Sequence, residues 1–133
     1  MIEAETNGGA PSPVAFLPAT HDLAVRYYGG RPPVTFRGHV AVIEERVVGV
    51  GGISFVGDVP WIFSEMTDEM RVRRKDCARA VRVLEKQAAD FAGPLFAVVT
   101  ATSAPRLLER MGFEPTGLDM DEGAVRGPIW VRP

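Results

Sequence analysis

The sequence predicts a mixed α/β domain, with one central sheet that begins as an antiparallel meander, continues with parallel crossover strands and is flanked by helices. Two apolar strand patterns, 40–43 and 47–56, are separated by the short turn "EER". From Cys77 to Phe91, apolar residues recur mostly at spacings of three and four, the period of a helix with one buried face. The apolar run "LFAVVT", 95–100, follows and is typical of a strand buried on both faces.

The chain is long enough for one domain and carries little net charge. Its 133 residues are 46% hydrophobic, with 15 basic and 17 acidic side chains. This balance gives no electrostatic reason to expect nucleic acid or a membrane as partner. We expect a single domain over 14–133, preceded by a flexible N-terminal arm, 1–13, of mostly small and polar residues.

Compartment signals favour a cytoplasmic protein. Cys77 is the single cysteine, so no disulfide can form within the chain, which suits a reducing compartment. No apolar run approaches the roughly 20 residues of a membrane span. The N-terminus lacks both the basic and the apolar region of a signal peptide.

The domain is expected to begin with a short strand and a short helix. Val14–Thr20 predicts an edge strand closed by Pro18, because proline cannot donate a backbone hydrogen bond. Thr20 is a suitable N-cap for a helix over Asp22–Tyr28, and Gly29-Gly30 ends it.

The second strand of the hairpin contains three glycines, Gly49, Gly51 and Gly52. Glycine inside a strand indicates a bulge or a close approach of another backbone, which a bound ligand can also require. A bent strand without a ligand explains the pattern equally well. The segment 58–66 then predicts a turn and a third meander strand.

Two helices and three strands complete the predicted order. The long helix is expected over 76–92, ended by Gly93-Pro94, and is followed by the strand 95–100. In "SAPRLLERMGF", Ser103 is a plausible N-cap, and Gly112 suits the C-terminal cap of a second helix. Strands near 113–117 and 124–131 are expected last, joined by the acidic loop "LDMDEG".

Basic side chains cluster at the start of the long helix: Arg71, Arg73, Arg74, Lys75, Arg79 and Arg82. Free backbone N–H groups and the positive end of the helix dipole lie there, so additional cations are unfavourable unless an anion is present. A phosphate group would satisfy both backbone and side chains. The alternative is a solvated basic face, partly neutralised by neighbouring acidic residues.

Few residues suggest chemistry. Glu65, at the end of the third strand and beside apolar residues, is a candidate general base, or alternatively an exposed strand residue. His21, His39 and Cys77 are not at metal-ligand spacings, so no metal site is expected. Ser64 lacks the flanking glycines of a nucleophile elbow, which argues against a serine hydrolase.

The order of elements, and the segment Leu107–Phe113 ("LLERMGF") with the strand before it, resemble the GCN5-related N-acetyltransferase (GNAT) superfamily. The resemblance covers about residues 14–131 and implies a GNAT-like mixed sheet. It also implies acetyl-coenzyme A as cofactor and acetyl transfer to a small-molecule or protein amine. The small size is most similar to compact members found near phage structural genes, for which a virion is an alternative location.

The resemblance also implies the site. Glu65 lies near the position of the family's usual base. The fourth strand and the loop and helix start after it are implied to bind the cofactor through Phe63, Glu65, Arg71, Arg73, Arg74, Lys75, Asp76, Cys77 and Ala78.

The sequence departs from the family pattern at two places. The family's loop Q/R-x-x-G-x-G/A has no glycines here, and Asp76 stands at a small-residue position whether Arg71 or Arg73 is aligned with the first position. Leu108 replaces the tyrosine that protonates the leaving thiolate in many members. We therefore expect weak or absent coenzyme A binding and slow transfer.

These departures leave a second class of function open. A non-catalytic structural or interaction protein of the same fold would need neither the glycines nor the tyrosine. A homo-oligomer, or a place in a larger assembly, is expected in either case. A nucleic-acid binder is less favoured, since the net charge is −2 and aromatics do not interleave with the arginines.

Overall fold

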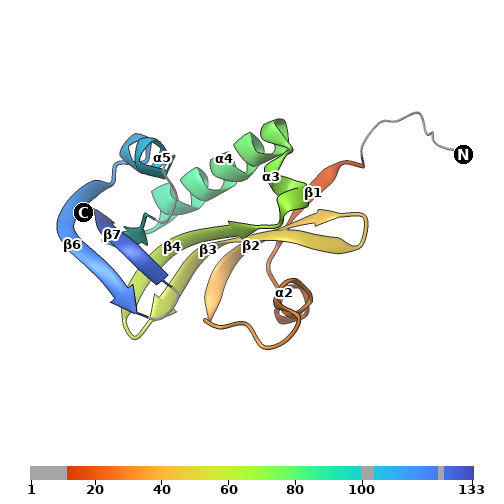
Figure 1. Cartoon of the computed structure of the whole chain (residues 1–133), viewed down its shortest axis with the longest axis horizontal. Helices are drawn as coiled ribbons and strands as arrows, with labels where there is room; N and C mark the ends of the chain where they lie inside the picture. Colours follow the sequence, from red (N-terminus) through yellow and green to blue (C-terminus); the bar gives the residue numbers. More distant parts are fainter. Residues whose placement is uncertain (1–11, 100–103, 123–124) are drawn as a thin grey trace, which may run out of the picture.

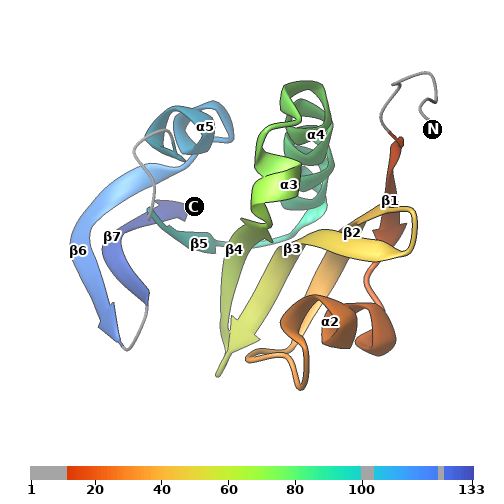
Figure 2. The ribbon, with the colours of Figure 1, turned by 45° about the vertical axis from the view of Figure 1, so that its right-hand side comes forward.

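A computed structural model describes residues 12–99, 104–122 and 125–133. Within them the strands form one sheet in the order β1-β2-β3-β4-β5-β7-β6. Helices α3, α4 and α5 lie on one face of the sheet and α2 on the other (Figures 1 and 2). The elements are β1 (Val14–Pro18), α2 (His21–Tyr28), β2 (Phe36–Ile43), β3 (Arg46–Val56), β4 (Val59–Met66), α3 (Asp68–Arg71), α4 (Arg74–Asp90), β5 (Leu95–Val98), α5 (Ala104–Arg110), β6 (Glu114–Glu122) and β7 (Val125–Arg132).

The predicted fold class is confirmed. β1 is an edge strand, β2, β3 and β4 form the antiparallel meander, and β5 pairs in parallel with β4. The first helix is capped as expected, since the Thr20 side chain accepts from the Leu23 N–H and Gly29 adopts a left-handed conformation with φ 71°. Gly112, with φ 89°, likewise follows α5.

The core lies between the sheet and the helices α3, α4 and α5, in two clusters. The first lies along β3, β4 and β5 and includes Ile53, Ile62 and Leu95. The second lies at the β1–β2 end and is closed by Met70, which is 1% exposed. These buried side chains fix α4 on the sheet and therefore fix the position of its N-terminus.

Both predicted consequences of the β3 glycines are present. The register of β2 against β3 shifts where Ala41 pairs with Gly49 but Val42 pairs with Val47, as in a bulge. At Gly52, a Cβ atom would overlap the carbonyl oxygen of Arg37, so only glycine fits. This close approach is between β2 and β3 themselves and does not by itself indicate a ligand.

The basic segment is more helical than predicted. Residues 68–71 form the one-turn helix α3, whose N-cap Thr67 accepts a hydrogen bond from the Met70 N–H. Burial of Met70 in the core stabilises this turn, which the charge pattern alone did not indicate. α4 then begins at Arg74, two residues before the predicted start, and ends at Asp90.

The C-terminal prediction was wrong in one respect. The acidic segment 118–122 is not a loop but the second half of β6, where Asp119 pairs with Pro128 and Glu122 with Val125. The pairing is irregular between Pro115 and Asp119, so the strand bends within this stretch. Cross-strand pairing with β7 overrides the low strand propensity of acidic residues.

Several predictions fall outside the described residues: most of the N-terminal arm, the Ser103 cap and the end of the strand at Thr100. No helix of the described chain is long and apolar enough to cross a membrane.

Candidate functional site

The strands β4 and β5 separate after a single parallel pair, Trp61 with Phe96. From there β5 continues along β7 on its other side, so beyond Trp61 β4 has no strand partner on the side facing β5 among the described residues. Backbone N–H groups on that side are therefore available to a ligand. Figure 2 shows the separation below α4 and α5.

A groove of about 1270 Å³ lies over this separation, between α4 and α5. Its sides combine the C-terminal half of β4, the exposed flank of α4 and the inner side of α5. It is lined by Ile62, Phe63, Ser64, Glu65, Met66, Arg71, Ala78, Val81, Arg82, Leu84, Glu85, Ala97, Val98, Arg106, Leu107, Leu108, Arg110 and Met111.

Four arginines and two glutamates give the groove a net positive lining. Arg110 is paired with Glu85 at 3.1 Å, and Arg71 approaches Asp68 only at 3.8 Å. Arg82 and Arg106 form no ion pair within the described part of the chain, so both can bind an anion. The groove therefore favours a large, negatively charged ligand.

Glu65 lies at the β4 end of the groove, in contact with α2 on the opposite face of the sheet. The Tyr28 phenol donates a 2.8 Å hydrogen bond to Glu65 Oε2. The pKa of Tyr28 is well above its usual value because of burial first, and then because of the hydrogen bond to the Glu65 carboxylate and its charge. The Tyr27 pKa is raised by burial and then by Glu65, against a smaller opposing effect of Arg71. Tyr28 therefore stays protonated and orients Glu65.

A carboxylate of α4 itself already lies at the N-terminus of this helix. Asp76, the third residue of the helix, accepts from Arg73 at 3.2 Å and from Arg79 at 3.0 Å. Arg73 also donates to the Ser12 carbonyl oxygen at 2.7 Å, and the Arg79 guanidinium lies 4.9 Å from the ring centroid of Phe16. Both arginines thus attach α4 to the N-terminal segment.

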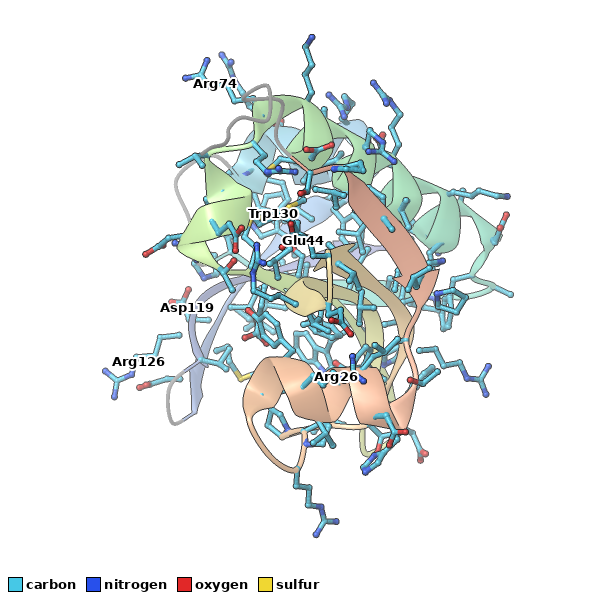
Figure 3. The ribbon with its side chains drawn as sticks, turned by 90° about the vertical axis from the view of Figure 1, so that its right-hand side faces the viewer. Arg26, Glu44, Arg74, Asp119, Arg126 and Trp130 are labelled. Carbon is cyan, nitrogen blue, oxygen red and sulfur yellow. The ribbon has the colours of Figure 1, made fainter. Side chains whose placement is uncertain are left out.

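The sequence-predicted cofactor residues consequently separate into two groups. Those that line the groove are Phe63, Glu65, Arg71 and Ala78. Arg73 and Asp76 bind one another, while Arg74 and Lys75 are exposed, and Arg74 points away from the domain in Figure 3.

Cys77 faces the core rather than the groove. Its thiol lies 3.3 Å from the Met70 carbonyl oxygen, and the side chain packs on the second core cluster. Burial, and then the neighbouring Asp76 charge, raise its pKa. This position suits a structural residue, not a nucleophile.

Sequence reasoning missed the residues that α2 and α5 contribute. Arg106 and Arg110 are four residues apart, so a helix over 104–110 places them on one face. The sequence alone could therefore have predicted this pair of arginines. Tyr28 lies 37 residues before Glu65, and no sequence pattern connects them. Leu108, at the expected tyrosine position, is 7% exposed and belongs to the first core cluster.

The groove suits acetyl-coenzyme A better than the α4 N-terminus does. The groove fits a large polyanion by size and by the charges of Arg82 and Arg106. The α4 N-terminus fits it less well, because Asp76 already neutralises that end and no glycine allows close backbone approach. The residues present therefore fit the cofactor through arginine side chains rather than through a backbone cradle.

Comparison with family sequence models and with curated protein sequences finds no match. Among solved structures, Escherichia coli ElaA superposes with a TM-score of 0.59 at 11% identity, covering 91% of this chain and 100% of that one. A Bordetella pertussis protein assigned to the GNAT family of acetyltransferases gives 0.54 at 14% identity, covering 85% and 71%. The ribosomal-protein-S18-alanine N-acetyltransferase of Escherichia coli gives 0.51 at 11% identity, covering 91% and 94%.

These structural similarities cover at least 85% of the chain. At this level of identity they establish architecture and not activity. The chain therefore has the fold of the GCN5-related N-acetyltransferases.

Proposed function

We propose that the chain is an acyl-coenzyme A-dependent N-acetyltransferase that acts on an amine, with Glu65 as general base. One observation carries the proposal. Glu65 lies at the opening between the separated strands β4 and β5, where β4 borders the arginine-lined groove on one face of the sheet and the Glu65 carboxylate is turned toward α2 on the other. A base beside an anion-binding groove is the arrangement that acetyl transfer from an anionic donor to an amine requires.

The residues have distinct roles in this proposal. Tyr28 holds Glu65 through Oε2, so that the other carboxylate oxygen can accept a proton from the acceptor ammonium. Backbone N–H groups of β4 on the side facing β5 would polarise the thioester carbonyl. Arg82 and Arg106 would bind the phosphates of coenzyme A, which when bound supplies the activated acetyl group.

Protonation of the leaving thiolate is the slow part of the proposed reaction. Leu108 has no proton to give to a leaving thiolate, and it packs in the core. Solvent water would have to protonate the thiolate, at a loss of roughly 100-fold relative to a positioned acid. We therefore expect slow turnover.

The second candidate is a non-catalytic protein of this fold. The specific observation in its favour is the Arg73–Asp76–Arg79 network, which occupies the α4 N-terminus with intramolecular contacts. In that case the groove would be a remnant, and the chain would act as an interaction or structural module.

Calorimetry with coenzyme A and a multiple-turnover acetylation assay with a panel of amines separate the two candidates. If the proposal holds, wild type binds and acetylates slowly, Arg82→Ala and Arg106→Ala each weaken binding about tenfold, and Glu65→Gln abolishes turnover while binding persists. Arg126→Ala is the matched control, because among the described residues Arg126 pairs only with the exposed Asp121, in the β6–β7 hairpin. Absence of coenzyme A binding and of turnover would favour the second candidate.

A further inference from the structure

A row of aromatic side chains lies on the α2 face of the sheet and leads to Glu65. Ile62 packs toward α4 in the first core cluster, so Trp61, Phe63 and Glu65, which alternate with it, face the other way. The Phe63 ring meets Phe36 edge-on at 5.1 Å. The Trp61 ring lies 5.5 Å from that of Phe96. These four rings, which we call the aromatic row, are only half-buried.

The aromatic row leads to a carboxylate, that of Glu65. Glu65 is exposed, and among the described residues its side chain has one hydrogen bond, the one that Tyr28 donates to Oε2. The other carboxylate along the groove, Glu85, is on α4 and is paired with Arg110. A ligand on the α2 face that contacts the aromatic row therefore meets the Glu65 carboxylate beside an apolar surface.

We propose that the acceptor is a small arylalkylamine, a primary ammonium carried two or three bonds from an aromatic ring. The inference rests on the proposed function and specifies its acceptor. The ammonium would pair with Glu65, and the ring would pack on the exposed edges of Phe63 and Trp61. Aromatic pairs are worth about 0.5–1.5 kcal/mol beyond the area that they bury, which favours a ring over an alkyl chain.

Other amines match these features less well. A polyamine has no ring to pack on the aromatic row, and Glu65 can pair with only one of its cations. A peptide carries backbone amide groups that need hydrogen-bond partners, which aromatic rings do not supply. A small arylalkylamine has only a ring and an ammonium, and the aromatic row and Glu65 match both.

The proposed reaction needs no reactant besides the amine, acetyl-coenzyme A and solvent. Glu65 takes one proton from the ammonium, and the amine nitrogen forms a bond to the acetyl carbonyl carbon. The carbon–sulfur bond breaks, and its electron pair leaves with sulfur. The acylated nitrogen gives its second proton to solvent, solvent protonates the thiolate and Glu65 returns its proton to solvent, so that one proton is released in all.

Binding of the amine to the coenzyme A-free protein tests the proposal apart from catalysis. A nuclear magnetic resonance titration with 2-phenylethylamine should move the Trp61 indole signal and leave that of Trp130, which packs on the first core cluster, unchanged. Affinity should exceed that for n-butylamine and for spermidine at least tenfold. Glu65→Gln should lower it at least tenfold and Phe63→Leu several-fold. Glu45→Gln, an exposed change in the β2–β3 turn, should alter it less than twofold.

Three results would overturn this inference: equal affinity for 2-phenylethylamine and n-butylamine, unchanged affinity in Glu65→Gln, or tighter binding of a tripeptide that begins with phenylalanine. The proposed function fails separately. Selective amine binding without any coenzyme A binding would reject acetyl transfer and leave the amine site in place. Acetylation of amines without preference for an aromatic ring would support acetyl transfer and reject the arylalkylamine as acceptor.

Discussion

The Asp76 carboxylate lies 3.2 Å from the Arg73 guanidinium, and this pair occupies the start of α4, where a phosphate would otherwise be attracted. The aspartate is favourable there because it faces the positive end of the helix dipole. It also removes Arg73 from the set of residues available to a ligand. The same contact that stabilises the helix start thus opposes anion binding.

Replacing Asp76 with asparagine should strengthen coenzyme A binding and weaken the fold. The change removes a negative charge from the helix start and releases Arg73 and Arg79. We expect affinity to rise about tenfold, equivalent to about 1.4 kcal/mol. The free energy of unfolding should fall by about 1 kcal/mol, because a favourable dipole interaction is lost. Calorimetry and urea denaturation measure the two effects.

Asp90→Asn is the matched control for that experiment. Asp90 ends the same helix and is exposed, and within the part of the chain that the structure describes its one ion pair is with Lys86, at 3.2 Å. Its loss should leave coenzyme A affinity unchanged. Unchanged affinity in Asp76→Asn as well would mean that the α4 N-terminus takes no part in binding.

The two tyrosines should ionise only at a pH above the usual range for a phenol. Burial and the Glu65 charge raise the pKa of both Tyr27 and Tyr28, which are the only tyrosines in the chain. Ultraviolet absorption of tyrosinate should therefore appear mainly above the ordinary phenol pKa of about 10. Because the raised pKa belongs to the folded state, stability from this source is complete below pH 10 and declines as pH rises above it. Glu65→Gln should shift the titration toward lower pH, and an unshifted titration would argue against the contact.

Gly52→Ala should destabilise the fold by at least about 2 kcal/mol, since the new Cβ would overlap the Arg37 carbonyl oxygen. Gly30→Ala provides the comparison, because a Cβ at Gly30 meets no atom within 4 Å and should change stability little. Thermal melts of the two variants measure the difference. Similar melting temperatures would show that β2 and β3 can separate at low cost.

Leu95→Ala should lower the free energy of unfolding by about 2–5 kcal/mol, the range for truncating a buried leucine. Leu95 is 0% exposed and lies in the first core cluster, beneath α4. Leu118→Ala makes the same chemical change at a side chain that is 65% exposed, and should cost less than about 0.5 kcal/mol. A small effect at Leu95 would contradict the packing of β5 under α4.

Local chemistry was sufficient to predict much of the fold. Thr20 caps the start of α2, and Gly29 ends the helix in a left-handed conformation. Both residues act within one helical turn of chain. The β2–β3 hairpin closes through Glu44-Glu45, with Ile43 paired to Arg46. Short-range signals such as these depend on neighbouring residues, so they are visible in a sequence.

Segments whose structure depends on distant partners were predicted less well. The acidic stretch 118–122 forms a strand because β7 pairs with it, and α3 forms because Met70 is buried by side chains from other strands. Neither partner is local. Propensity alone therefore predicted a loop in both places.

The sequence by itself determined that the chain forms a GNAT-like sheet, that Glu65 lies near the end of the third meander strand and that arginines gather near the long helix. Only the tertiary structure decided which charges face the groove. Arg73 and Arg79 turn toward the N-terminal segment, whereas Arg106, which the basic cluster did not include, lines the groove. The physical reason is that a side chain's partners depend on how helices pack on the sheet, and this packing joins residues as distant as Tyr28 and Glu65.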